Sequence, residues 1–173
     1  TDKESAAIPE ASADSDYISN RKFTEFPISP EVLKGIIEMG YEVATPVQAA
    51  TIDAAMAGKD MLVRAKTGTG KTAAFCIPAI ERVPDGFRKP GVLILEPTRE
   101  LAQQTAAECD KMAKYRDVST ATLVGGLPIG PQTDLLEGGA EIISGTPGRV
   151  KDHIARGNLD LGELKVIILD EAD

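Results

Sequence analysis

The stretch D-M-L-V-R-A-K-T-G-T-G-K-T, residues 60–72, decides the fold class. A short apolar run leads into a glycine-rich turn that matches the pattern G-x-x-x-x-G-K-[ST], except that Ala65 occupies the first glycine position. Gly68 and Gly70 carry no Cβ, so they allow backbone N–H groups to converge on one centre, and the following helix adds its own free N–H groups. The stretch therefore predicts a strand, a phosphate-binding turn and a helix.

Two side chains complete this predicted anion site. Lys71 places a positive charge beside the outer phosphates, and the Thr72 hydroxyl is the short oxygen ligand that a phosphate-bound Mg²⁺ takes. The alternative interpretation is a Gly/Thr turn that only caps a helix. The expected strand before the turn and helix after it favour a nucleotide site.

The composition of the chain is typical of one α/β domain. The net charge of the 173 residues is −8, and residues 1–20 contribute −4 of it. This Ala/Ser/acid-rich segment has few large apolar residues, so we expect a disordered tail. An acidic total argues against a broad nucleic-acid-binding face, so any polyanion site must be local and built from a few Arg side chains and backbone amides.

The two cysteines, Cys76 and Cys109, are not at a metal-ligand spacing and fall on segments that read as amphipathic helices. We expect free, buried thiols in a reducing compartment. No apolar run reaches ~18–20 residues and no basic-then-apolar leader is present. These features predict a cytosolic protein or, in a eukaryote, a nuclear one.

Helical and strand patterns alternate along the rest of the chain. Ser29-Pro30 and Thr45-Pro46 are helix starts, each with a capping residue followed by proline. A helix that Pro78 should kink, unless the preceding turn absorbs the lost hydrogen bond, follows the glycine-rich turn. Two further helices are predicted by the stripe Leu101, Thr105, Cys109 and Met112 and by the pair Val150 and Ile154.

Four short, nearly uniformly apolar runs have the pattern of strands that are covered on both faces. They are G-V-L-I-L-E-P (91–97), T-A-T-L-V-G-G (120–126), E-I-I-S-G-T (141–146) and K-V-I-I-L-D-E (165–171). Strands that alternate with helices predict a parallel sheet with helices on both faces. Ligands bind at the carboxyl ends of the strands in such a sheet, and each polar cluster of this sequence follows a predicted strand.

The last of these clusters fits the second half of a nucleotide site. Asp170 can hold the Mg²⁺ that bridges the outer phosphates, and Glu171 can orient and deprotonate an attacking water. Two solvated acids are the alternative for this pair taken alone, but an upstream phosphate-binding turn argues against it.

Three other clusters suit a sugar-phosphate backbone. P-T-R-E-L-A (97–102), Gly125-Gly126 and T-P-G-R (146–149) each combine a helix start or tight turn with at most one arginine. Each is weak alone, since Arg99 and Arg149 are by default solvated charges at helix starts. His153 lies between Asp152 and Ile154 on a predicted helix, where we expect a surface role rather than catalysis.

The ordered set of motifs resembles the DEAD-box family of ATP-dependent RNA helicases. Residues 65–72, 97–102, 125–126, 146–149 and D-E-A-D (170–173) look like its motifs I, Ia, GG, Ib and II. G-Y-E-V-A-T-P-V-Q (40–48) is similar to the family's Q motif, and Phe23 lies 17 positions before Gly40, where the family has an isolated aromatic. The resemblance covers residues 23–173. It implies an N-terminal RecA-like domain, a P-loop NTPase fold, at residues 21–173, with the Q motif at 23–48.

The resemblance also implies a role for each matching residue, with ATP and Mg²⁺ as cofactors. Gln48 would pair with the edge of adenine and Phe23 would stack on its ring. The phosphates would be held by Thr67, Gly68, Thr69, Gly70, Lys71 and Thr72. Thr72 and Asp170 would bind the metal, and Lys71, Asp170 and Glu171 would be the catalytic group. The contacts to the RNA backbone would come from Pro97, Thr98, Arg99, Gly125, Gly126, Thr146 and Arg149. Asp173 would couple the site to a second RecA-like domain.

The chain departs from the family pattern at three places. Ala44 replaces the usual first proline of the Q motif, and Lys66 and Thr69 are permitted variants in the phosphate-binding turn. The sequence given stops at Asp173, before the family's Ser-Ala-Thr motif and second domain. We therefore expect residues 1–173 alone to bind adenine nucleotide weakly, to lack appreciable RNA-stimulated ATPase activity, and to expose a sheet edge or apolar face.

Three functions are compatible with these motifs. The first is an RNA-dependent ATPase that locally unwinds short duplexes, and the second is an ATP-gated RNA clamp or assembly scaffold. The third, a DNA helicase or an unrelated P-loop ATPase, is disfavoured by the Q motif together with residues 97–102 and 146–149. Backbone contacts carry no base code, so the target RNA is not encoded in these motifs.

Overall fold

The computed structural model describes residues 21–57 and 70–170. Several predictions of the sequence therefore lie outside the described residues. These are the tail at 1–20, the strand expected before the glycine-rich turn, and Thr67, Gly68, Thr69, Glu171 and Asp173.

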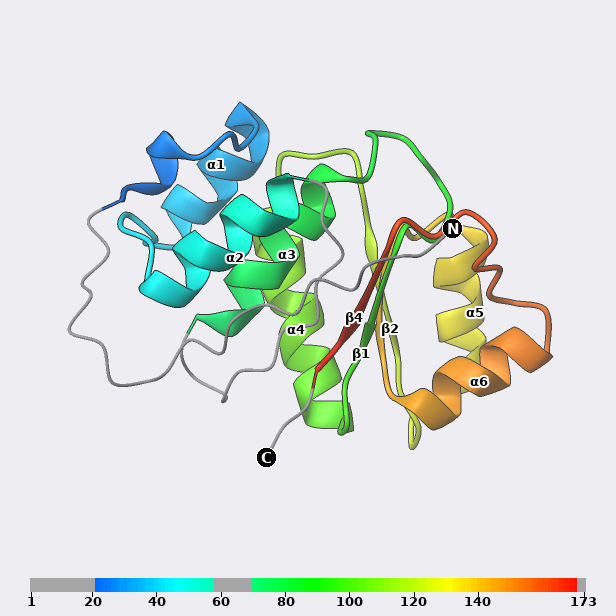
Figure 1. Ribbon diagram of the computed structural model, residues 1–173. Helices are drawn as coiled ribbons and strands as arrows, with labels where there is room; N and C mark the ends of the chain where they lie inside the picture. Colours follow the sequence, from blue (N-terminus) through cyan, green and yellow to red (C-terminus); the bar gives the residue numbers. More distant parts are fainter. Residues whose placement is uncertain (1–20, 58–69, 171–173) are drawn as a thin grey trace, which may run out of the picture.

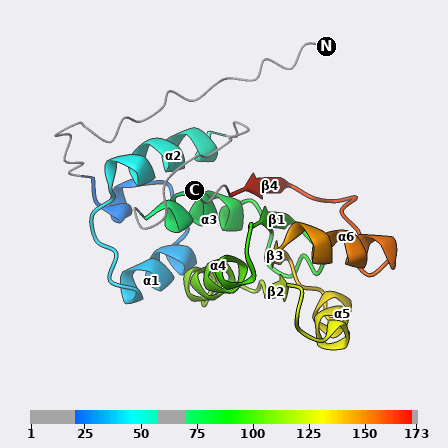
Figure 2. The same ribbon diagram turned by 90° about the horizontal axis from the view of Figure 1, so that it is seen from below.

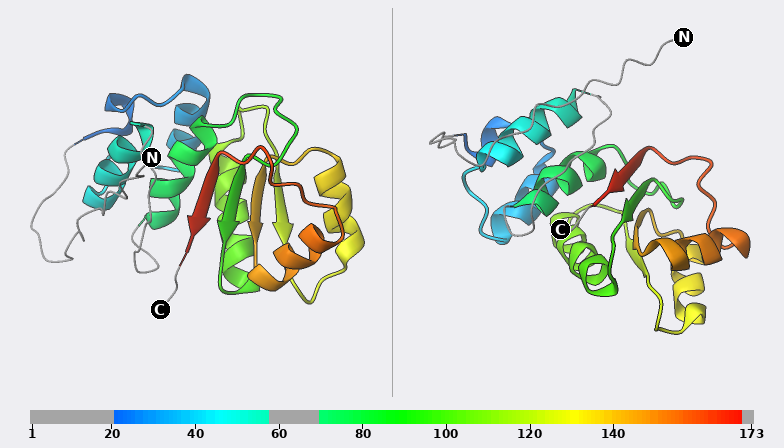
Figure 3. Two further views of the ribbon diagram at one scale, coloured as in Figure 1. Left: turned by 45° about the vertical axis from the view of Figure 1, so that its right-hand side comes forward. Right: turned by 60° about the horizontal axis from the view of Figure 1, so that its bottom comes forward.

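Four parallel strands form the sheet of the described residues, in the order β2-β3-β1-β4. They are β1 (Val92–Leu95), β2 (Thr120–Leu123), β3 (Ile142–Gly145) and β4 (Val166–Leu169). In Figure 3 all four arrows run the same way, so their carboxyl ends share one edge. Each strand lies within an apolar run from which it was predicted, so the predicted parallel sheet is confirmed.

Helices precede the sheet and connect its strands (Figure 1). The described helices are the 3₁₀ turn η1 (Phe23–Glu25), α1 (Pro30–Glu38), α2 (Pro46–Met56), α3 (Lys71–Glu81), α4 (Arg99–Met112), α5 (Ile129–Glu137) and α6 (Pro147–Ala155). The predicted caps are present, because Ser29 Oγ accepts the Val32 N–H at 3.4 Å and Thr45 forms a capping box with Gln48. The α3 helix continues unbroken through Pro78.

Helices cover both faces of the sheet, as predicted (Figure 2). Val92 and Ile94 of β1 point into a core that they share with α1 to α4. Leu93, between them, points to the opposite face and packs in a second cluster with Leu136 of α5 and Val150 of α6. This alternation of adjacent side chains between two cores explains why the strand sequences are apolar without a break.

The β4 strand is an exception to the predicted burial. It is the edge strand of the described sheet, and Ile168 is buried while Ile167 and Leu169 are 54% and 48% exposed. The expectation that every strand is covered on both faces is therefore wrong for β4. Within the described residues, no helix or strand fully covers the side chains of Ile167 and Leu169.

The prediction for α6 is also corrected. Val150 is buried as expected, but Ile154 is 44% exposed and His153 is fully buried. The helix turns the i, i+3 pair Val150 and His153 inward instead of the i, i+4 pair. His153 is accommodated inside because both ring nitrogens have hydrogen-bond partners there, Gln132 and Asn158. The expected surface role of His153 is wrong.

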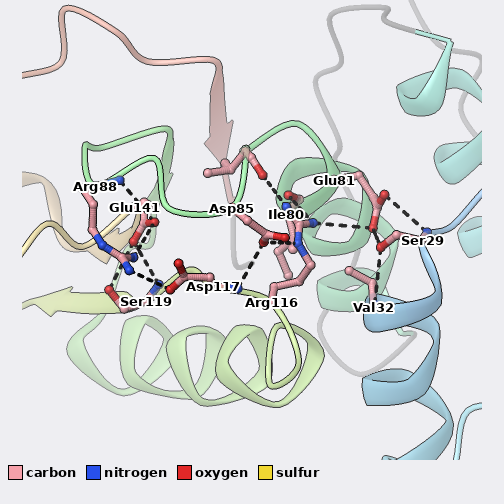
Figure 4. A network of polar contacts seen from close by, with 11 residues as sticks. Ser29, Val32, Ile80, Glu81, Asp85, Arg88, Arg116, Asp117, Ser119 and Glu141 are labelled. Atoms are coloured by element: carbon pink, nitrogen blue, oxygen red, sulfur yellow. Dashed lines mark hydrogen bonds and ion pairs between the residues drawn. The ribbon is translucent and has the colours of Figure 1, made fainter.

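A polar network holds the amino-terminal edge of the sheet (Figure 4). The buried Glu141 carboxylate, just before β3, accepts the backbone N–H of Ser119 at 3.1 Å and that of Arg88 at 3.3 Å. Nearby, the Arg116 side chain donates to Asp85 at 2.6 Å and to the carbonyl oxygens of Ile80 and Val83. The polar groups at this edge therefore have hydrogen-bond partners from the protein itself.

Candidate active site at the carboxyl edge of the sheet

Gly70 forms the turn from which α3 begins. It is the N-cap of α3 with φ +72°, a left-handed conformation, and no side chain of the described residues caps the helix there. A Cβ at this position would lie 2.5 Å from Gln48 Nε2, so any other residue would be strained by its backbone conformation and would also displace the Gln48 amide. The uncapped helix start leaves backbone N–H groups and the positive end of the helix dipole for an anion.

Gln48 joins the Q-motif helix to this turn. Its Oε1 accepts the Thr45 N–H at 2.9 Å, its Nε2 donates to the Gly70 carbonyl at 3.2 Å, and the side chain is buried. The amide therefore sits beside the phosphate-binding turn, as the resemblance implies. Each of its polar atoms makes one of these bonds, which leaves the second N–H of Nε2 and the second lone pair of Oε1 as the groups that could pair with adenine.

Phe23 lies in the core. Its ring is buried and packs against Phe26 and Tyr41, with ring centroids 6.2 and 5.8 Å away. Stacking on adenine stays a prediction, and it would require a face of this ring to be uncovered.

Lys71 and Asp170 form a buried ion pair between Lys71 Nζ and Asp170 Oδ1. The two side chains are only 4% and 6% exposed. Lys71 begins α3, whereas Asp170 follows β4 and is anchored by its N–H, which donates to the Leu95 carbonyl at 3.0 Å. Thr72 lies half-buried in the same first turn. The structure thus brings together the described residues predicted to bind phosphate and metal.

Glu96 is a residue of this site that the sequence reasoning missed. It follows β1, is 1% exposed, and accepts a hydrogen bond from the Thr105 hydroxyl at 2.6 Å through Oε1. The pKa of Glu96 is raised to about 8, mainly by burial and next by its interaction with Asp170, while the hydrogen bond from Thr105 opposes the shift. The signal that could have identified Glu96 from the sequence is an acidic residue directly after an apolar strand.

Two of the predicted RNA contacts, Arg99 and Gly126, lie against each other after β1 and β2. Thr98 caps α4 by accepting the Leu101 N–H at 3.2 Å, and Arg99 starts that helix. Gly126, after β2, has φ +80°, and a Cβ there would lie 2.8 Å from Arg99 Nη1. The arginine therefore passes directly over the glycine backbone. Pro97, Thr98, Arg99, Gly125 and Gly126 are all exposed.

Arg149 of α6 binds the loop that follows β2, residues 124–127. Its Nη1 donates to the Leu127 carbonyl at 2.9 Å and to Gln132 Oε1 at 3.2 Å. Thr146, the N-cap of α6, uses its N–H to bind the Leu123 carbonyl at 3.0 Å and has no capping hydrogen bond from its side chain. Three motifs distant in sequence thus form one group of arginines, helix starts and glycine backbone, exposed at Arg99, Gly125 and Gly126 and half-buried at Thr146 and Arg149, which suits phosphate binding.

Within the described residues, no helix is long and apolar enough to cross a membrane, and no group of three or more His, Cys, Asp or Glu side chains could enclose a metal ion. The donors that are described, Asp170 and Thr72, fit Mg²⁺, which takes few protein ligands and keeps water and phosphate oxygens for the rest.

Comparison with known proteins agrees with this geometry. The sequence model of the DEAD/DEAH box helicase family matches residues 45–173. Nucleolar RNA helicase 2 of Rattus norvegicus is 43% identical over 157 residues, which cover 87% of this chain and 20% of that protein. ATP-dependent RNA helicase dhh1 of Aspergillus clavatus is 43% identical over 152 residues, which cover 88% of this chain and 30% of that protein.

A solved structure resembles the chain in three dimensions. The crystal structure of a DEAD box protein from the hyperthermophile Methanococcus jannaschii superposes with a TM-score of 0.80 at 40% identity, over 87% of this chain and 41% of that chain. The likeness confirms the predicted α/β fold of RecA-like type. The chain spans between 20% and 41% of the length of these relatives.

Proposed function

The chain belongs to the DEAD/DEAH box helicase family, and on this premise we propose that the full-length protein is an ATP-dependent RNA helicase. It couples the binding and hydrolysis of ATP to RNA binding and local unwinding of short duplexes. The observation that carries the proposal is the location of two groups at one sheet edge. The buried Lys71–Asp170 pair lies at the carboxyl ends of β1 and β4, and the Arg99–Gly126–Arg149 group, in which only Arg149 is half-buried, lies at the ends of β1, β2 and β3.

The nucleotide half of the site binds Mg²⁺-ATP. Gln48 and Phe23 recognise adenine, and the phosphates lie against the start of α3, with Thr67, Gly68, Thr69, Gly70, Lys71 and Thr72 around them. Lys71 binds Asp170 in the structure, so phosphate oxygens and the Asp170 carboxylate compete for one ammonium group. A bound Mg²⁺ would supply charge neutralisation at the phosphates, with Thr72 and Asp170 as its protein ligands. Glu171 orients and deprotonates water.

The RNA half of the site binds the sugar-phosphate backbone through Pro97, Thr98, Arg99, Gly125, Gly126, Thr146 and Arg149. Helix starts and glycine N–H groups hold phosphates without reading bases, so the preference is for single-stranded RNA of any sequence. Asp173 couples this edge to a second RecA-like domain. We place the protein in the cytosol or nucleus, where the two buried free cysteines stay reduced.

RNA-stimulated ATP hydrolysis by the natural full-length protein tests the proposal. Single-stranded RNA should stimulate the wild type, and DNA of the same sequence should not. Lys71→Ala and Glu171→Gln should abolish the stimulated rate, whereas Lys34→Ala, which removes an exposed lysine from α1, should leave it unchanged. Equal stimulation by DNA and RNA, or no stimulation by either, would contradict an RNA-dependent ATPase.

A further inference from the structure

A buried hydrogen-bonded cluster lies directly behind the Arg149 guanidinium. Gln132 of α5 and His153 of α6 are 5% and 0% exposed, and Gln132 Oε1 is 3.0 Å from His153 Nε2. Gln132 Nε2 also donates to the Val124 carbonyl at 2.9 Å, at the end of β2. The Gln132 side chain therefore joins the start of the 124–127 loop to both α6 residues, Arg149 and His153.

The direction of each hydrogen bond in the cluster is determined. Because Gln132 Nε2 is a donor to a carbonyl, Oε1 faces Arg149 and His153 and accepts from both. His153 must then carry its proton on Nε2, which leaves Nδ1 to accept the Asn158 amide at 3.2 Å. Burial lowers the pKa of His153, and Arg149 and Arg156 lower it further against the opposing effect of Asp152, so the ring stays neutral.

This cluster determines how Arg149 presents itself to solvent. Nη1 alone bonds to the Leu127 carbonyl and to Gln132, and within residues 21–57 and 70–170 the structure gives Nε and Nη2 no acceptor. An arginine side chain that is free to rotate would have to lose that freedom on binding a phosphate. Here Nη1 is anchored at two points, and the remaining N–H groups of the planar guanidinium keep a fixed direction.

We propose that Gln132 and His153 are positioning residues for RNA binding, which hold Arg149 and the 124–127 loop in the arrangement that receives a phosphate of the RNA backbone. The inference rests on the proposed function, because it assigns Arg149 to the RNA backbone. Neither residue needs to contact RNA, since both are buried.

The first test is a double-mutant cycle on the natural full-length protein, measured as affinity for single-stranded oligouridylate in the presence of a non-hydrolysable ATP analogue. Gln132→Met, which keeps the side-chain length and removes its hydrogen bonds, should weaken RNA binding about tenfold. The same substitution in an Arg149→Ala background should have a clearly smaller effect, because one of the two groups that Gln132 positions is absent and only the bond to the Val124 carbonyl is still lost. Gln103→Met, on the exposed side of α4, is the matched control and should be neutral.

His153 supplies a second test that does not depend on the folding of Gln132→Met. His153→Leu should weaken RNA binding, and His153→Gln, which can place an N–H near the position of Nε2, should restore most of it. Affinity for the ATP analogue alone should be unchanged in all the variants, which separates positioning from loss of fold.

The outcomes distinguish this inference from the proposed function. If Gln132→Met weakens RNA binding equally with and without Arg149, or if His153→Gln is as weak as His153→Leu, then the cluster only stabilises the fold and the positioning role is overturned. If Arg149→Ala itself leaves RNA affinity unchanged, the assignment of Arg149 to RNA in the proposed function fails instead.

Discussion

Lys71 and Asp170 lie 99 residues apart in the sequence and form a buried ion pair at the carboxyl edge of the sheet. Glu96 is buried beside them, and its raised pKa of about 8 has Asp170 as its second cause after burial. Among residues 21–57 and 70–170, this part of the site therefore places the Glu96 and Asp170 carboxyl groups together with the Lys71 ammonium group, and we expect Glu96 to carry a proton at neutral pH.

The first prediction concerns this arrangement. Breaking a buried ion pair by removing one partner typically costs about 3–5 kcal/mol. Asp170→Asn should cost less, about 1–2 kcal/mol, because Glu96 can ionise and take the place of the lost charge next to Lys71. The combined Glu96→Gln and Asp170→Asn variant should lose more than the sum of the two single changes. Urea unfolding at pH 7 measures each free energy.

Asp134→Asn, an exposed change on α5, is the control for that series and should stay close to the wild type. Additive effects of Glu96→Gln and Asp170→Asn, within about 0.5 kcal/mol, would show that the two carboxyl groups do not substitute for each other.

The second prediction concerns Gly70. An alanine there must adopt φ +72° and places its Cβ 2.5 Å from Gln48 Nε2, so Gly70→Ala should lose about 1–3 kcal/mol of stability and break the Gln48–Gly70 hydrogen bond. Gly148→Ala is the control, because nothing lies within 4 Å of a Cβ at that position in α6. Thermal unfolding of the two variants should show a clear drop for Gly70→Ala alone, and equal melting temperatures would contradict the steric argument.

The third prediction concerns the opposite edge of the sheet. The Arg116 side chain is 8% exposed, and its guanidinium donates hydrogen bonds to Asp85 and to two carbonyl oxygens near the end of α3. Arg116→Ala removes the donor to the Val83 carbonyl, while Asp85 keeps the Asp117 N–H and the Ile80 carbonyl keeps the Val83 N–H, so the change should cost about 1–3 kcal/mol. Arg116→Lys should recover only part of that, since one ammonium group cannot reach three acceptors in the directions of a planar fork.

The control for Arg116 is Arg156→Ala, which removes an exposed i, i+4 ion pair with Asp152 and should cost no more than about 0.5 kcal/mol. Guanidinium chloride would mask such ion pairs, so urea is the denaturant of choice for this comparison. Full stability of Arg116→Lys would mean that the positive charge, rather than the geometry of the fork, holds this network.

The features that could be predicted from the sequence are those with a short-range physical signal. The strands 92–95, 120–123, 142–145 and 166–169 are apolar runs that end in polar residues, and their carboxyl ends collect the polar loops by topology alone. The caps of α1 and α2 were predictable because Ser29 and Thr45 are followed directly by proline.

The α5 helix and the burial of His153 were missed, the first for a local reason and the second because its partner is distant in sequence. The α5 helix was not predicted because Gly130 and Pro131, both normally poor in helices, stand in its first turn, where the free N–H positions tolerate proline. His153 reads as a surface residue until Gln132, on another helix, provides its hydrogen bond. Sequence periodicity carries no information about such a partner.

The last prediction is a pH dependence of stability that arises from His153. Burial is the main cause that lowers its pKa below the ordinary value of 6.5. At pH values between that lowered pKa and 6.5, the unfolded chain binds a proton that the folded protein does not, so stability is fully present above pH 6.5 and is lost as the pH falls through this window. The loss cannot exceed about 1.4 kcal/mol per pH unit for one proton.

His153→Gln has no titrating group at this position, so its free energy of unfolding should fall less steeply between pH 7 and 5, while acid effects of the carboxylates cancel between the two proteins. Parallel curves for the wild type and His153→Gln over this range would show that the ring is protonated without hindrance in the folded state, and that the neutral hydrogen-bonded cluster behind Arg149 does not persist.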